Sequence, residues 1–137
     1  MAKRIFGRAT AAAVAAANAD ITVPAGETWR VFGVSVHVVN DAGVAARLPH
    51  VELVISGTVR AGVASVVPAA AGETVLFNFG AGVVASAAQV PAASGTVTDP
   101  MPVFVAEAGD VIRGRLVAGQ GADAINVFAH FEREVAI

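Results

Sequence analysis

The feature that most constrains the fold is a period-two alternation of apolar and polar residues between positions 28 and 39. One face of an extended chain there would carry Phe32, Val34, Val36 and Val38. Alternate residues of a β-strand point to opposite faces of its sheet, so the pattern predicts a strand with one buried face. A second layer must cover that face, so the chain is expected to build a layered β fold.

Short β-branched runs separated by Gly, Pro and Asp continue from residue 21 onward, which is typical of an antiparallel sandwich or barrel. Further strands are expected at residues 20–23, 47–56, 58–67, 74–79, 83–90, 102–105, 111–118 and 125–135. The final one would place on a single face Ile125, Val127, Ala129 and Phe131. About eight or nine strands are enough for two packed sheets.

Three turns share one pattern, in which alanine, glycine and an acid come immediately before an expected strand. They are Ala25-Gly26-Glu27, Ala71-Gly72-Glu73 and Ala108-Gly109-Asp110. Glycine allows the positive φ angle that a tight turn needs, and the acid keeps the turn in water. We expect these turns to be equivalent corners of the β fold.

The surface of the folded chain must be poor in charge, because 55% of the residues are hydrophobic and 15% are charged. Ordinary soluble domains contain about 25% charged residues. Lysine commonly protects exposed sheet faces and edges, and this chain has a single lysine, Lys3. Two interpretations stay open: a partner covers much of the surface, or the composition reflects an alanine-rich genome.

Charge and cysteine content argue against several classes of protein. The net charge of −2 is not the footprint of a nucleic-acid-binding protein. The absence of cysteine excludes disulfides and thiolate metal or redox sites. The start of the chain imitates a secretory signal only weakly, since its apolar stretch is almost entirely alanine. No stretch approaches the roughly 20 apolar residues of a membrane span, so a soluble chain without membrane or nucleic-acid partners is expected.

Residues 1–19 are expected to form an N-terminal arm, and residues 20–137 a single β-sandwich domain. Alanine favours helix, yet residues 10–20 are too few to hold a helix in isolation, so for them a short docked helix and an extended arm both stay open. The expected partner-binding residues are Arg4, Ile5, Phe6 and Arg8, with the two apolar side chains as anchors. We favour an arm held by neighbouring subunits, so removing residues 2–19 should weaken assembly and leave thermal stability nearly unchanged.

Two pairs of histidine and glutamate are the best candidates for metal binding or acid–base chemistry. His50 and Glu52 share one strand face, as do His130 and Glu132. The full ligand pattern of a cupin-like metal site is not assembled around them. We therefore expect these side chains to be solvated, and we predict no catalytic, metal-binding or cofactor-binding residue.

Arg113 and Arg115 could bind a phosphate or carboxylate, or pair with acids of a neighbouring chain. A solvated cationic face with cross-strand partners such as Glu132 or Glu134 is the simpler interpretation. The sequence has no glycine-rich phosphate loop and no nucleophile elbow, so no nucleotide or other small-molecule substrate is expected. Trp29 is expected to cover the end of the core.

The run VPAGETWRV (residues 23–31), followed by alternating valines, resembles the opening of small jelly-roll virion proteins of tailed bacteriophages, which include cement or decoration proteins of the head. AGDVI (residues 108–112) and FERE (residues 131–134) are similar to the closing half of such proteins. The resemblance covers most of residues 21–135 and implies an all-β, jelly-roll-like antiparallel sandwich of about eight strands with an extended N-terminal arm. No functional residue is transferred, because these families act through surfaces.

The resemblance implies a structural protein that binds the outer surface of a phage head, bridges major capsid subunits and stabilises the shell. Its expected partners are the major capsid protein and copies of itself, as a dimer or trimer. We expect it to be made in the host cytoplasm, to reside on the virion and not to be an enzyme. The alternatives are a tail or baseplate subunit, a cupin-like metal- or ligand-binding domain, and a carbohydrate-binding module on a virion.

Overall fold

The computed structural model describes residues 2–14, 17–41, 47–65, 68–70, 72–83, 94–117, 119 and 123–136. Within these residues the chain forms β-strands and no helix, which confirms the all-β prediction. The strands are β1 (Ala2–Val14), β2 (Ala19–Thr22), β3 (Glu27–Val39), β4 (Leu48–Ile55), β5 (Thr58–Ala64), β6 (Thr74–Gly80), β7 (Ser94–Pro100), β8 (Phe104–Glu107), β9 (Val111–Val117) and β10 (Ala124–Ala136).

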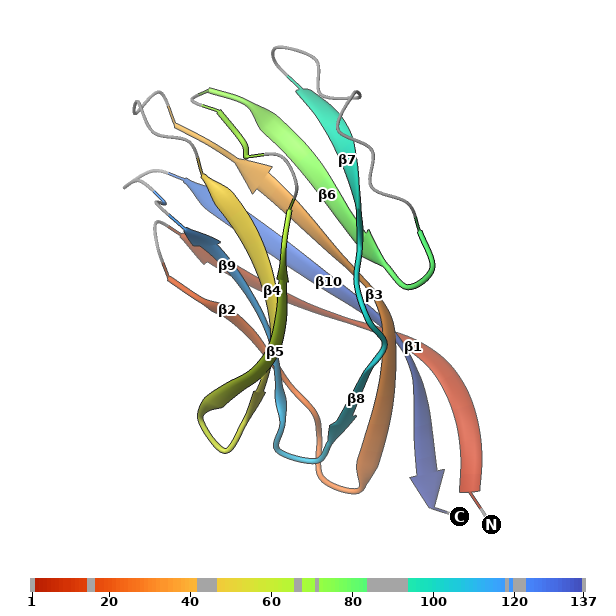
Figure 1. Cartoon of the computed structure of the whole chain (residues 1–137). Coiled ribbons are helices and arrows are strands. Elements are labelled where there is room, and N and C mark those ends of the chain that lie inside the picture. The colour runs from red at the N-terminus through yellow and green to blue at the C-terminus, as the bar shows by residue number, and fades with distance from the viewer. Residues whose placement is uncertain are drawn as a thin grey trace.

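These strands form two sheets that pack face to face as a β sandwich (Figure 1). Sheet A has six strands in the order β1-β10-β3-β6-β7, and β8 pairs with the first part of β3. Sheet B has four strands in the order β2-β9-β4-β5. Neighbouring strands are antiparallel, except that β6 and β7 are parallel. The predicted antiparallel sandwich is therefore confirmed.

Apart from β7 and β8, the strands follow the pairing of a jelly roll. Along the chain, β1 pairs with β10, β2 with β9, β3 with β6 and β4 with β5, as in one long ribbon folded back on itself. Rolling up that ribbon adds the pairs β10–β3 and β9–β4, which close the two sheets. β7 and β8 then extend sheet A.

The core lies between the sheets and follows the predicted alternation. Its buried members on β3 include Val34, Val36 and Val38, and those on β10 are the four residues predicted at 125–131. Trp29 is buried and stacks on Phe131 with the ring centroids 3.7 Å apart, as expected for a residue that covers the core. A Cβ atom at Gly114 would clash with the side chain of Val127, so the sheets approach closely there.

Phe32 does not join the buried valines of β3, and the prediction that it does is wrong. His130 pairs with Gly33 while Phe131 pairs with Val31, so Phe32 is the extra residue of a β-bulge. A bulge turns a side chain out of the regular alternation. Phe32 is 42% exposed and lies on the outer face of sheet A.

The predicted turns have the expected backbone. Gly26, Gly72 and Gly109 have φ angles of 80°, 72° and 89°, which favour glycine at these positions. The first and third turns are neighbours, since the N–H of Gly109 donates to the carbonyl of Val23 and the N–H of Val23 donates to that of Asp110. These two turns therefore form one end of the sandwich.

Residues 2–14 are extended, and they form the edge strand of sheet A rather than a helix. β1 pairs with β10 along all of its 13 residues, from Ala2 opposite Ala136 to Val14 opposite Ala124. Alternate side chains of β1 pack against the core, namely Ala9, Ala11 and Ala13. β1 therefore belongs to the sandwich.

Gly7 lets β1 pass close over the ring of Phe131, since a Cβ atom at Gly7 would lie 2.8 Å from Cε2 of that ring.

β7 is, after β1, a second strand that the sequence did not predict, and Val97 and Asp99 on it are buried. Residues 84–90 of the strand expected at 83–90 lie outside the described residues.

A buried ion-pair cluster joins the segments that follow β3, precede β4 and precede β10. Arg47 and Asp123 are both fully buried, and Nε of Arg47 donates to Oδ2 of Asp123 at 3.0 Å. NH2 of Arg47 donates to Oδ1 of Asp41 at 2.6 Å. The N–H of Asp41 donates to Oδ1 of Asp123 at 2.7 Å, which closes the cluster. Charges buried in this way need their partners, because the unpaired groups would be costly to desolvate.

Candidate partner-binding surface

Five exposed side chains gather on the outer face of sheet A. Their strands carry them near the end of the molecule where Figure 1 shows both chain ends. They are Arg4, Phe6 and Arg8 of β1 and Arg30 and Phe32 of β3. β10 lies between these two strands, with Glu132 opposite both Phe6 and Arg30. We call the five side chains the aromatic–arginine patch.

The two phenylalanines of the patch contact each other across β10. Their ring centroids are 6.2 Å apart with an interplanar angle of 80°, an edge-to-face geometry that aromatic pairs favour. Phe6 is 77% exposed and Phe32 is 42% exposed. Full burial of a phenylalanine side chain contributes roughly 1.5–3 kcal/mol. The pair can therefore serve as an apolar anchor for a partner.

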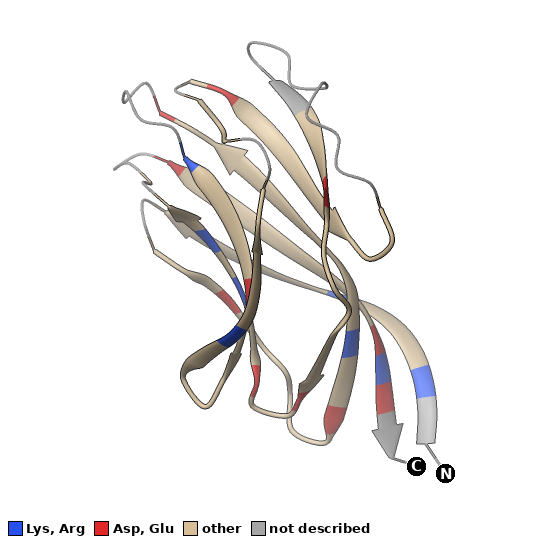
Figure 2. Ribbon diagram, viewed as in Figure 1, with Lys and Arg blue, Asp and Glu red and all other residues tan. Residues whose placement is uncertain are grey.

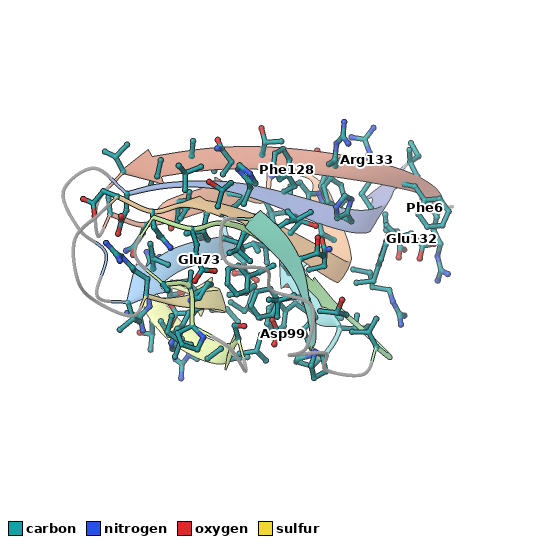
Figure 3. The ribbon with its side chains drawn as sticks, turned by 90° about the horizontal axis from the view of Figure 1, so that it is seen from above. Phe6, Glu73, Asp99, Phe128, Glu132 and Arg133 are labelled. Carbon is teal, nitrogen blue, oxygen red and sulfur yellow. The ribbon has the colours of Figure 1, made fainter. Side chains whose placement is uncertain are left out.

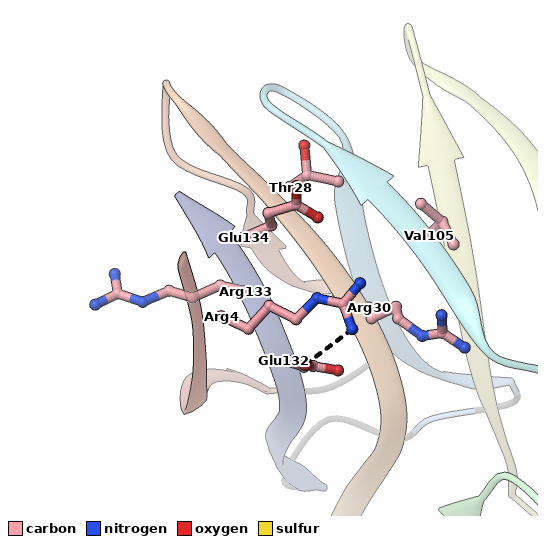
Figure 4. A pocket seen from close by; sticks show the side chains of 7 residues that line it. All are labelled: Arg4, Thr28, Arg30, Val105, Glu132, Arg133 and Glu134. Atoms are coloured by element: carbon pink, nitrogen blue, oxygen red, sulfur yellow. Dashed lines mark ion pairs between the residues drawn. The ribbon is translucent and has the colours of Figure 1, made fainter. Parts of the chain in front are cut away.

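The arginines of the patch are available to a partner as well. The side chain of Arg4 is 68% exposed, and its ion pair with Glu132 is 3.8 Å long between NH1 and Oε1. Figure 4 shows Arg4 reaching toward Glu132. The two side chains line a hollow of about 180 Å³, together with Arg30 and Val105. Exposed pairs of this kind contribute little stability, so Arg4 can exchange Glu132 for a carboxylate of a partner.

The four partner-binding residues predicted from the sequence lie on two faces of β1. Arg4, Phe6 and Arg8 point outward, whereas Ile5 is half-buried on the opposite face, opposite Arg133 in the register. Figure 3 shows Phe6 at the end of the sheet with Glu132 and Arg133. Phe6 is therefore the exposed apolar side chain among the four. Sequence reasoning missed Arg30 and Phe32 as members of this surface, because the bulge at Phe32 places them beside Phe6 and no local pattern predicts a bulge.

Arg133 is engaged on the side of β10 away from the patch. Its NH1 donates to Oε1 of Glu27 at 3.2 Å, and Nε1 of Trp29 donates to the same oxygen at 3.0 Å. The hydrogen bond from Trp29 is the main cause that lowers the pKa of Glu27; desolvation opposes it and Arg133 adds to it. These contacts hold the end of β10 against the start of β3.

The two histidine–glutamate pairs lie on different sheets. His50 and Glu52 are on β4 in sheet B, and His130 and Glu132 are on β10 in sheet A. The fold therefore does not bring the two pairs together. No group of three or more His, Asp or Glu side chains among the described residues is arranged to hold a metal ion.

Arg113 and Arg115 do not pair with Glu132 or Glu134, and that expectation is wrong. The arginines lie on β9 in sheet B, and the two glutamates lie on β10 in sheet A. Outward-facing side chains of the two sheets point away from each other, so they cannot meet. The register within sheet B supplies other acids instead.

The partners of these arginines are acids on the strands beside β9. Arg113 donates to both carboxylate oxygens of Asp20, at 2.8 and 3.1 Å, and this hydrogen bonding raises the pKa of Arg113. Nε of Arg115 donates to Oε1 of Glu52 at 3.0 Å. We call these four residues the charge ladder of sheet B. Its cations and anions neutralise each other within the chain.

His50 lies beside the charge ladder, and this gives a prediction for the pH dependence of stability. Burial is the main cause that lowers the pKa of His50 from 6.5; Arg115 adds to the effect and Glu52 opposes it. A lowered histidine pKa stabilises the fold above the unfolded pKa, and this contribution is lost as pH falls through the folded pKa. We expect His50→Gln to lose less thermal stability than the wild type between pH 7 and pH 5. Equal losses in thermal melts would contradict this.

No protein-family model matches the chain, and no curated protein matches it in sequence. Among the described residues there is no helix long and apolar enough to span a membrane. The aromatic–arginine patch is therefore defined by the fold and side-chain positions of this chain alone.

Proposed function

We propose that the chain is a structural virion protein, a cement or decoration subunit that binds the outer surface of a phage head. It bridges major capsid subunits and stabilises the shell. The aromatic–arginine patch supports this proposal most, because it presents an exposed anchor on a continuous sheet. The jelly-roll pairing adds support, since the resemblance to phage virion proteins implies that fold. The proposed partners are the major capsid protein and copies of the chain.

Binding through the patch would combine apolar burial with charge. Phe6 and Phe32 enter an apolar depression of the capsid, while Arg4, Arg8 and Arg30 meet acidic groups around it. Aromatic residues and arginine are enriched where protein interfaces gain most of their free energy. Binding to the assembled shell and not to separated subunits stabilises the shell by mass action. The arginine contacts would lie at the solvent-exposed rim of the interface, where salt screens charges. The affinity should therefore fall as the salt concentration rises.

Phe6→Ser is expected to weaken binding to heads roughly 10- to 100-fold, because the variant lacks the burial energy of the most exposed ring. The measurement is occupancy of the protein on heads prepared without it, by pelleting and cryo-electron microscopy. Val59→Ser is the matched control, since Val59 is 46% exposed on β5 in sheet B, away from the patch. This control should occupy heads like the wild type.

Other outcomes would replace the proposal. Density on the tail or baseplate would favour a structural subunit of those parts. Stoichiometric metal in the purified protein would favour the cupin-like alternative, and selective binding on a glycan array would favour a carbohydrate-binding module. A protein that associates with no part of the particle is not a virion protein, and the proposal would then be wrong.

A further inference from the structure

Beyond the patch, the outer face of sheet A carries three rows of side chains without Lys, Arg, Asp or Glu. In the order β1, β10, β3, β6, β7, the first row is Thr10, Phe128, Ser35, Asn78 and Thr98. The second is Ala12, Asn126, His37, Leu76 and Thr96. The third, over the first four strands, is Val14, Ala124, Val39 and Thr74. All are exposed or half-buried, and we call them the neutral face.

The two outer faces of the sandwich are built differently. Sheet B presents the charge ladder, in which Asp20, Arg113, Glu52 and Arg115 pair across three strands. Figure 2 shows no charged residue along the middle of β10, β3 and β6, and it shows the charges of β3 toward the end where the chain ends lie. The acid on β7, Asp99, is buried and does not reach the outer face. Antiparallel sheets that face water usually alternate apolar and polar residues, with the polar side outward. Here the outward side of sheet A includes Phe128 and Leu76 at its centre, and both side chains are half-buried.

We infer that the neutral face is the contact surface between two copies of this chain. The inference rests on the proposed function in one respect, since that function expects copies of the chain to act together. A second copy fits because two identical faces without charge meet with no like-charge repulsion. A strongly charged partner, by contrast, would lose solvation there and gain no opposite charge.

The size of the neutral face suits such a contact. Five strands about 4.8 Å apart and three rows about 6.7 Å apart give a surface of roughly 24 by 20 Å. The side chains make its accessible area larger than this projection, of the same order as the roughly 800 Å² that each partner contributes to a stable interface. The aromatic–arginine patch lies beyond the first row, so contact confined to the rows leaves the patch free for a capsid.

Asn126→Asp tests the inference with a change that keeps the shape of the side chain. Asn126 is exposed in the middle row, and the substitution places a like charge in each of two facing copies. We expect self-association in sedimentation velocity to weaken at least about 10-fold, and salt to restore part of it. Asn18→Asp is the matched control, because Asn18 is exposed between β1 and β2 and outside the neutral face. Its self-association should equal that of the wild type.

A second pair of variants is needed if the interface between the copies accommodates the charge introduced by Asn126→Asp. Leu76→Asp in the same row should weaken association further, whereas Val59→Asp on sheet B should leave it unchanged. Thermal melts establish that each variant is folded. A wild type that stays monomeric at tens of micromolar, or equal association of all variants, would overturn the inference. Head binding by Phe6→Ser tests the aromatic–arginine patch, and self-association tests the neutral face. Because the two measurements are independent, each proposal can fail without the other.

Discussion

Deleting residues 2–14 is expected to lower the melting temperature of the chain by at least about 10 °C. The deletion removes all of β1 and leaves the edge of β10 unpaired over 13 residues. It also uncovers the ring of Phe131 beneath Gly7, and full burial of a phenylalanine contributes roughly 1.5–3 kcal/mol. Circular dichroism during heating measures the effect. The sequence alone led to the opposite expectation, in which this segment was a separable arm.

The control for this deletion is the double variant Arg4→Ser, Phe6→Ser, which keeps the backbone of β1 and alters its outward side chains. Surface substitutions usually change stability by less than about 0.5 kcal/mol, so the double variant should melt within roughly 2 °C of the wild type. A truncated chain that melts at the wild-type temperature would show that the sandwich does not need β1.

Arg47→Ala is expected to destabilise the chain by about 3–5 kcal/mol, because it removes the guanidinium that donates to the fully buried carboxylate of Asp123. Urea denaturation measures the change in free energy of unfolding. Arg4→Ala is the control, since the exposed 3.8 Å pair of Arg4 with Glu132 should contribute less than about 1 kcal/mol.

A further variant separates the electrostatic cost of removing the Arg47 charge from the cost of removing its packing. Replacing Arg47, Asp41 and Asp123 together by apolar residues should recover part of the stability that Arg47→Ala loses. Loss of less than about 1 kcal/mol in Arg47→Ala would mean that water reaches the cluster, and the burial argument would then be wrong.

Regular alternation was the part of the fold that the sequence predicted well. The valines of β3 and the inward residues of β10 are buried because each strand meets the core with a period of two. β1 was missed because alanine favours helix, and its strand conformation depends on pairing with β10 far along the chain. β7 was missed because Gly95, Asp99 and Pro100 are typical of turns, yet parallel pairing with β6 holds them in a strand.

The candidate surface was predicted in part. Arg4, Phe6 and Arg8 were identified from residue type, and their common face follows from their spacing once the segment is known to be a strand. Phe32 and Arg30 join them through a bulge and a register that no local pattern reveals. The partners of Arg47 and Arg113 are equally hidden, because Asp123 and Asp20 lie far away in sequence. Non-local pairing is therefore the information that the sequence pattern lacked.

The pairing of β1 with β10 also sets the order in which the sandwich can close during synthesis. β1 emerges from the ribosome early, but Val14 cannot find Ala124 until most of the chain has been made. Such non-local contacts slow folding, because loop closure costs entropy before the contacts form. Meanwhile the nascent segment between Arg8 and Asp20 has no charge to keep other unpaired strands away. Expression rate and temperature should therefore affect the yield of folded protein more than they affect its final stability.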